Sequence, residues 1–226
     1  MHPKTSQINP DTFEQAFKKV AEAGDTAVVI TLSGKLSGTY QSAMIAAEDY
    51  EDHIFVVDSE NVCVGERILI ERGLELRDQG LTAAKIKEVL DHEKKHIRLL
   101  ALLDTLEYLK KGGRISSAAA FAGNILSIKP VIAVENGEVT LVGKARGSKK
   151  GNNLLRELVQ NCGGINFSKP YALAYSGISD DLAKKYIEDS SEVWKEATDT
   201  LKLTTVGCTI GTHAGPGAVA VAFFEN

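Results

Sequence analysis

The stretch ITLSGKLSGTYQSA, residues 30–43, decides the fold, because an apolar run ends there at a polar turn and a helical pattern begins. Residues 27–32 are β-branched or apolar with one polar interruption, which predicts a strand buried on both faces of a parallel sheet. Ser37 has the chemistry of a helix N-cap, and apolar residues follow it at helical spacing. We therefore expect a helix to begin near Ser37.

The turn between this strand and this helix is suited to an anion. A helix N-terminus presents backbone N–H groups and the positive end of the helix dipole. Ser37 and Thr39 add hydroxyls, and Gly38 allows close approach to the backbone. The alternative, which these residues leave open, is that Ser37 only caps its helix, because serine is a common N-cap.

The amino-acid composition, with 43% hydrophobic and 25% charged residues, is typical of an ordinary globular protein. The balance of 26 basic against 30 acidic residues argues against nucleic acid as a partner, since a phosphate-binding surface needs a basic face. Apolar runs are too short for a membrane span, and we expect a cytoplasmic protein. The cysteines are odd in number and form no CxxC, so we expect neither a disulfide framework nor a metal site.

Strand and helix patterns alternate up to residue 103, which predicts an α/β layer with right-handed crossovers. Further on, Asn136-Gly137 between two apolar runs is a hairpin signal. The expected fold class is therefore α/β, with an N-terminal α/β domain over residues 1–97 and a C-terminal α+β domain over residues 98–226. We expect one helix that begins near residue 37 and another that ends at residue 79, with further helices at 11–23, 82–96, 105–110, 116–126, 148–161 and 180–197. We expect strands at 27–32, 54–58, 98–103, 130–134, 139–142, 171–175, 201–206 and 218–224.

Two motifs invite a functional interpretation. Residues 92–96 spell HExxH, but the rest of a zinc-protease pattern is missing, and we interpret them as the solvated end of a helix. Residues 211–218 are rich in glycine, alanine and proline, which predicts a tight loop that something can approach closely. His213 lies in this loop and is the histidine that we single out as a candidate site residue.

Two basic segments, residues 110–114 and 144–150, each have two interpretations. Either they are solvated loops, or they form docking patches for an acidic partner or a phosphate.

Four ordered blocks, TSQ at 5–7, LSGTYQSA at 36–43, DTLEYLKKGGRI at 104–115 and HAGPGA at 213–218, resemble the DegV family. That family comprises bacterial fatty-acid-binding proteins, including the binding subunit of fatty acid kinase. The resemblance implies a two-domain DegV-like fold with a long-chain fatty acid between the domains. It also implies that the fatty acid carboxylate is bound by the hydroxyls of Thr5 and Ser37 and by the imidazole of His213. At the expected helix N-terminus, backbone N–H groups near Gly38 and Thr39 would bind the same carboxylate.

The resemblance further implies a lipid-binding, non-catalytic subunit that presents the fatty acid to a kinase for acyl phosphate formation. We find no phosphate-binding GxxxxGK[ST] motif, so we expect no cofactor on this chain. Arg114, Arg146 and Lys149 are candidate partner contacts. Family members usually begin with a strand and helix before the TSQ block, so we expect an N-terminal domain that is truncated relative to the family. Separately, Ile8 stands where family members have proline, so we expect a less rigid loop around Thr5.

The alternative function is an acyl hydrolase with Ser37 as nucleophile and His213 as base. The sequence lacks the GxSxG turn of such enzymes, and it does not indicate an acidic residue that would orient His213 as a base. The oligomeric state is not predicted.

Overall fold

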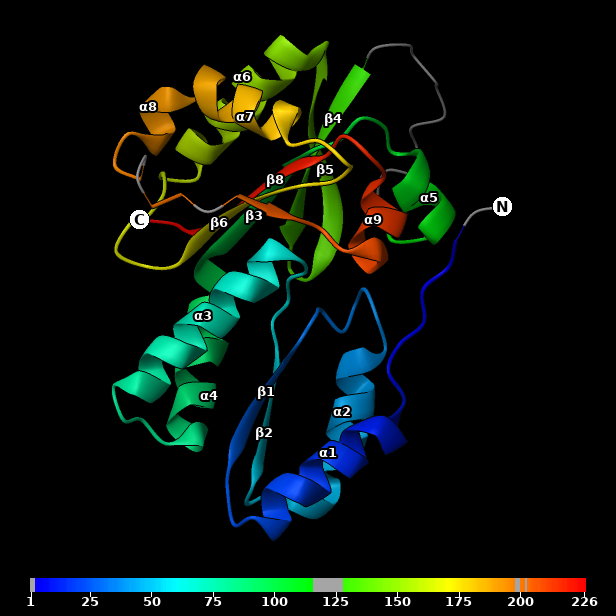
Figure 1. Cartoon of the computed structure of the whole chain (residues 1–226), viewed down its shortest axis with the longest axis vertical. Coiled ribbons are helices and arrows are strands. Elements are labelled where there is room, and N and C mark those ends of the chain that lie inside the picture. Colours follow the sequence, from blue (N-terminus) through cyan, green and yellow to red (C-terminus); the bar gives the residue numbers. More distant parts are fainter. Residues whose placement is uncertain (1–2, 116–127, 198–199, 202) are drawn as a thin grey trace.

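The computed structural model describes residues 3–115, 128–197, 200–201 and 203–226, and it shows a mixed α/β architecture with two sheets (Figure 1). The smaller sheet is the parallel pair of β1 (Ala27–Thr31) and β2 (Ile54–Asp58). The larger is a mixed sheet in the order β5-β4-β3-β8-β6-β7. Its strands are β3 (Ile97–Leu102), β4 (Ile128–Glu135), β5 (Glu138–Arg146), β6 (Tyr171–Tyr175), β7 (Leu203–Thr205) and β8 (Val219–Phe224).

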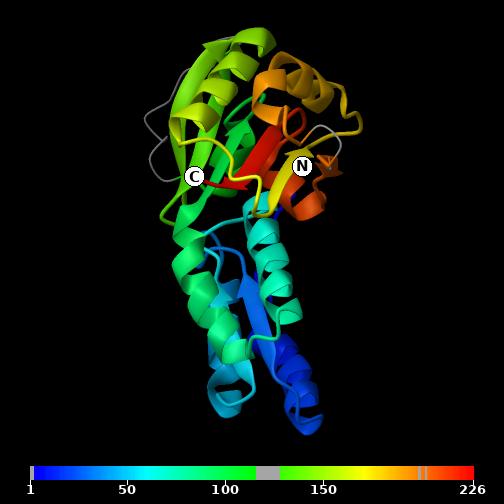
Figure 2. The same cartoon turned by 90° about the vertical axis from the view of Figure 1, so that its left-hand side faces the viewer.

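The parallel pair is covered on both faces by helices. Its first face packs against α1 (Pro10–Glu22) and α2 (Thr39–Ala47), and its second against α3 (Val64–Asp78) and α4 (Ala83–Glu93). The helix α3 also contacts β3, β6 and β8, so it joins the two sheets (Figure 2). Short 3-10 turns follow α2 (η1, Glu48–Tyr50) and α4 (η2, Lys94–His96).

The large sheet has two differently covered faces. Its first face packs against α6 (Ser148–Asn161), α7 (Asp181–Asp189) and α8 (Ser191–Trp194). The second is covered by α3 along one part, and by α5 (Glu107–Gly112) and α9 (Cys208–Ala214) along another. The N-terminal segment runs from α1 to the side of α5 and α9 (Figure 1), so residues from both ends of the chain meet there.

The hairpin predicted from Asn136-Gly137 is confirmed. The strands β4 and β5 pair in antiparallel register up to Glu135 opposite Glu138. Asn136 and Gly137 between them have φ angles of 50° and 82°. This left-handed backbone is the reason for an Asn-Gly pair at a two-residue hairpin turn.

Some predicted elements differ from the structure at their ends or in their environment. The strand β1 is half-buried along most of its length, because β2 is its only partner among the described strands. The N-cap of α2 is Gly38 and not Ser37, so the helix begins one residue later than an N-cap at Ser37 would give. The helix predicted over 180–197 is divided at Ser190, where the backbone leaves helical geometry (φ −121°, ψ 26°). The helix predicted at 116–126 lies outside the described residues.

Two predicted loops are regular structure instead. Residues 208–214 form α9, so His213 lies in the last turn of a short helix and not in a loop. Basic residues 144–150 belong to the end of β5 and the start of α6. No described helix is long and apolar enough to cross a membrane.

Candidate functional site

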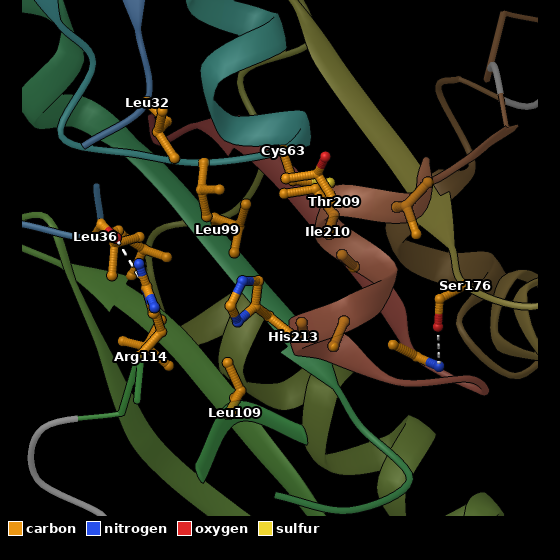
Figure 3. Close-up of a pocket in the computed structure, with 18 of the residues that line it drawn as sticks. Leu32, Leu36, Cys63, Leu99, Leu109, Arg114, Ser176, Thr209, Ile210 and His213 are labelled. Carbon is orange, nitrogen blue, oxygen red and sulfur yellow. Dashed lines mark hydrogen bonds between the residues drawn. The ribbon is translucent and has the colours of Figure 1, made fainter. Parts of the chain in front are cut away.

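A cavity of about 320 Å³ lies over the second face of the large sheet, beside α9 and the N-terminal segment (Figure 3). Its volume falls at the lower end of the range of small-molecule pockets, about 300–1,000 Å³. Most of its lining is aliphatic. The residues that line it are Thr5, Ser6, Ile8, Leu32, Leu36, Ser37, Thr39, Val62, Cys63, Leu99, Ala101, Leu103, Leu109, Arg114, Ile132, Val134, Val139, Ala174, Tyr175, Ser176, Val206, Thr209, Ile210, His213, Ala214, Ala218 and Ala220.

A row of alanines on three neighbouring strands forms part of the cavity wall. Ala174 on β6 is opposite Ala220 on β8, and Ala220 is opposite Ala101 on β3. Ile132 on β4 continues the row. Alanine is not a favoured strand residue, because it has little side chain to pack on a pleated surface. Here the short side chains leave space above the sheet, and the cavity occupies that space.

The N-terminal segment connects α9 to the start of α2. Thr5 Oγ1 lies 2.8 Å from His213 Nε2, and the backbone N–H of Ile8 donates to Thr39 Oγ1 at 3.4 Å. Between these contacts the Gln7 side chain lies directly over Gly38, where an added Cβ would come within 2.0 Å of Gln7 Oε1. The absence of a side chain at Gly38 therefore allows this segment to approach.

Ser37 is held so that its hydroxyl can donate into the cavity. Ser37 Oγ accepts the backbone N–H of Thr39 at 3.3 Å and lies 2.9 Å from Thr39 Oγ1. If the Thr39 hydroxyl donates to Ser37, the Ser37 proton remains for a ligand. The Ile8 N–H then satisfies Thr39 in turn, and such a chain of hydrogen bonds strengthens each member. An anion would receive the last proton of this chain.

His213 is positioned by close backbone contacts. A Cβ at Gly112 would lie 2.2 Å from His213 Nδ1, so α5 can pack against the imidazole only because glycine stands there. Gly215, which ends α9 with a φ of 72°, likewise leaves room for the Tyr108 ring. When His213 Nε2 carries a proton and donates it to Thr5, the Thr5 hydroxyl is a donor for a ligand.

Arg114 lies in the cavity wall. Its Nε donates to the carbonyl of Leu36 at 3.1 Å and its Nη1 to the carbonyl of Gly112 at 2.7 Å, so the half-buried guanidinium joins the loop at Leu36 to the end of α5. In Figure 3 the Arg114 and His213 side chains point toward the same space. The described lining contains no carboxylate, and this charge distribution favours a bound anion.

Two ionisable groups near the start of α3 are shifted toward their neutral forms. Burial, followed by the nearby Glu66 carboxylate, raises the pKa of the Cys63 thiol, which lines the cavity. A thiol with a raised pKa is a poor nucleophile. Burial, followed by the charge of Asp58, raises the pKa of Glu66 to about 7. The Cys63 thiol therefore adds no negative charge to the cavity lining at neutral pH.

The structure brings five of the predicted site residues to one place. Thr5, Ser37, Gly38, Thr39 and His213 are connected through the N-terminal segment, as described above. Of the residues predicted as partner contacts, Arg146 and Lys149 are exposed, but Arg114 lines the cavity. Contact with a partner stays a prediction for all three.

Sequence reasoning missed the cavity-lining alanines. Alternating alanines, Ala172 and Ala174 on β6, and Ala218 just before β8 with Ala220 and Ala222 on it, are a signal that could have been recognised. Strand alternation puts such residues on one face. Among the described residues, no group of histidine, cysteine, aspartate and glutamate side chains is arranged to hold a metal ion.

Comparison with protein families and curated sequences gives consistent results. A family model described as "Uncharacterised protein, DegV family" matches residues 1–226. A DegV domain-containing protein of Clostridium acetobutylicum is 32% identical over 229 residues, covering 99% of this chain and 78% of that protein. One from Deinococcus radiodurans is 34% identical over 224 residues, covering 97% of this chain and 77% of that protein.

Solved structures share the fold over nearly the whole chain. A fatty-acid-binding DegV family protein from Thermus thermophilus superposes with a TM-score of 0.86 at 28% identity, covering 99% of this chain and 79% of that chain. A stearic acid-binding protein from Eubacterium ventriosum gives a TM-score of 0.82 at 26% identity, covering 98% of this chain and 78% of that chain. Both structural relatives are described as binding fatty acids.

Proposed function

This chain belongs to the DegV family, and we propose that it binds one long-chain fatty acid in the cavity over the alanine row. One observation carries this proposal: an aliphatic cavity of about 320 Å³ has hydroxyl, imidazole and guanidinium groups but no carboxylate in its described lining. An amphipathic anion fits such a cavity better than a sugar or a nucleotide would, because those ligands need polar partners along their whole length.

The carboxylate is assigned to Thr5, Ser37 and His213, with Gly38 and Thr39 in support. Thr39 holds the Ser37 hydroxyl, and Gly38 allows the N-terminal segment to lie over the start of α2. Charge-assisted hydrogen bonds from these groups fix the head group. At about 0.8 kcal/mol per buried methylene, an acyl chain of about sixteen carbons supplies most of the affinity.

Presentation of the bound fatty acid to a kinase is the second part of the proposal. The protein itself acts as a cytoplasmic carrier that performs no chemistry, and a partner supplies ATP and forms the acyl phosphate. Arg146 and Lys149 lie exposed at the end of β5 and the start of α6, where a partner could reach them. Arg114 is half-buried in the cavity lining, so it is less accessible to a partner than Arg146 and Lys149.

The arrangement of the serine and the histidine favours a carrier over a hydrolase. A serine hydrolase pairs its nucleophile with an imidazole base. In the described part of the chain, Ser37 is hydrogen-bonded to Thr39, and His213 Nε2 lies against Thr5 instead. The Cys63 thiol, with its raised pKa, is no better placed as a nucleophile.

Lipid extraction tests the proposed function. Protein purified without added lipid is denatured in organic solvent, and the extract is analysed by mass spectrometry. We expect a non-covalently bound fatty acid of membrane-lipid length at a stoichiometry near that of the protein. An extract without fatty acid, from protein that also takes up no palmitate or oleate on incubation, would contradict it. Turnover of a chromogenic acyl ester, lost in both Ser37→Ala and His213→Ala, would favour the hydrolase.

A further inference from the structure

The loop that carries Ser37, residues 32–38 (the Ser37 loop), is held at two points by residues that lie far from it in the sequence. Ser33 Oγ donates to the carbonyl of Gly137 at 2.7 Å, across 104 residues of sequence. Arg114 Nε donates to the carbonyl of Leu36 at 3.1 Å. The Ser37 loop is thus fixed by the β4–β5 hairpin turn and by the segment that follows α5.

Ser33 is the centre of hydrogen bonding within this loop. Its side chain is fully buried, at 0% exposure. Its hydroxyl accepts the Lys35 N–H at 3.2 Å while it donates to Gly137. Its carbonyl accepts the N–H groups of Leu36 at 3.0 Å and Ser37 at 3.1 Å. A shift of Ser33 would therefore move the backbone of Ser37 directly.

The β4–β5 hairpin tip contributes to both the cavity and this loop. Val134 and Val139, which form the second pair from the turn, line the cavity. Gly137 in the turn has a φ of 82°, and a Cβ there would lie 2.6 Å from Ser33 Oγ. The same turn therefore packs against the acyl cavity and holds the Ser37 loop.

We propose that Ser33 is a positioning residue for the carboxylate site, through which the β4–β5 hairpin tip holds the Ser37 loop in register with Thr5 and His213. This inference rests on the proposed function, since it presumes a carboxylate at Ser37. The side chain of Ser33 donates to Gly137 and not to the ligand. Its loss weakens recognition of the charged head group and leaves the apolar cavity intact.

Titration with palmitate and with 1-hexadecanol, which has the same chain length and an uncharged head group, separates these effects. In Ser33→Ala we expect palmitate to bind about ten-fold more weakly, the equivalent of one charge-assisted hydrogen bond, and hexadecanol to bind unchanged. Gly137→Ala should do the same, because the new Cβ displaces Ser33. Its effect should be smaller when Ser33 is already alanine, since the crowding oxygen is gone.

Two control variants resemble these changes without touching the contact. Ser190→Ala removes the hydroxyl of another buried serine, which lies between α7 and α8 on the opposite face of the large sheet. Gly80→Ala adds a Cβ at a φ of 85° with nothing within 4 Å. Both should keep the palmitate-to-hexadecanol preference of the wild type.

The outcomes that would overturn the inference are distinct from failure of the proposed function. An unchanged preference in Ser33→Ala and Gly137→Ala, or an equal loss of both ligands, overturns the positioning role alone. Wild-type protein that binds neither ligand contradicts the proposed function and the inference with it. If Ser33→Ala does not fold, Gly137→Ala decides the question by the same ratio.

Discussion

The two faces of the large sheet carry very different side chains on the same strands. On the face toward α6 and α7, Leu173, Val221 and Leu100 form a cross-strand row and are almost fully buried. One residue away on each strand, the row on the other face is Ala174, Ala220 and Ala101. The strands pair in the same way in both rows, so the rows themselves differ in the size of their side chains.

This difference separates stability from binding. Large side chains on the first face bury apolar area against helices, which favours the folded state. Alanines on the second face leave space between the sheet and α9, and this space is the cavity. The period of two along a strand allows both properties to be encoded in a single segment such as YALAY, residues 171–175.

The largest expected effect is on stability, from truncating the packed face. Leu173→Ala should lower the free energy of unfolding by about 2–5 kcal/mol, because it leaves a cavity in a fully buried row. Urea denaturation measures this change. Palmitate affinity of the folded variant should match the wild type. A loss of affinity without a loss of stability would break the distinction between the two faces.

Filling the alanine face should have the opposite signature. Ala220→Phe puts a ring in the cavity and displaces at least three methylenes, which weakens palmitate binding by about 2.4 kcal/mol or more. Stability should change little because the space is already present. Ala133→Phe, the same substitution on the packed face, is the matched control and should destabilise by about 1–3 kcal/mol through overpacking. Unaltered palmitate binding by Ala220→Phe would remove the alanine row from the site.

The polar side of the cavity should contribute a comparable or smaller amount. Ser37→Ala and Thr5→Ala should each weaken palmitate binding by about 1.5–3 kcal/mol, the worth of a charge-assisted hydrogen bond. Calorimetric titration measures this, and both variants should melt like the wild type. Ser168→Ala, which removes a hydroxyl bonded only within its own exposed turn, is the control. If palmitate affinity is unchanged in both Ser37→Ala and Thr5→Ala, the role of Ser37 is purely structural.

Much of the fold followed from local sequence patterns. The Asn-Gly turn, the strand at 54–58 and the helix at 148–161 were predictable because periodicity and turn chemistry agreed there. The helix α9 was not, because glycine at Gly211 is a poor helix former. Its helical state depends on packing against α5, which a local pattern does not show.

The candidate site was predictable in its residues but not in its geometry. The resemblance to the DegV family indicated Thr5, Ser37 and His213 as site residues. Thr5 and His213 are 208 residues apart, and a local sequence pattern cannot show that residues so distant lie together. Arg114 was interpreted as a surface cation because charge alone does not show that its donors face two carbonyls. The division into domains at residues 97 and 98 stays a prediction, since α3 packs against both sheets.

The central claim is that the space over the alanine row supplies the affinity for a fatty acid. A series of fatty acids of different chain length tests it most directly. Saturated fatty acids of increasing length are titrated into delipidated wild-type protein, and the dissociation constants are compared. We predict about four-fold tighter binding for each added methylene until the cavity is full, and no gain beyond that length. Dissociation constants that do not depend on chain length would contradict the claim.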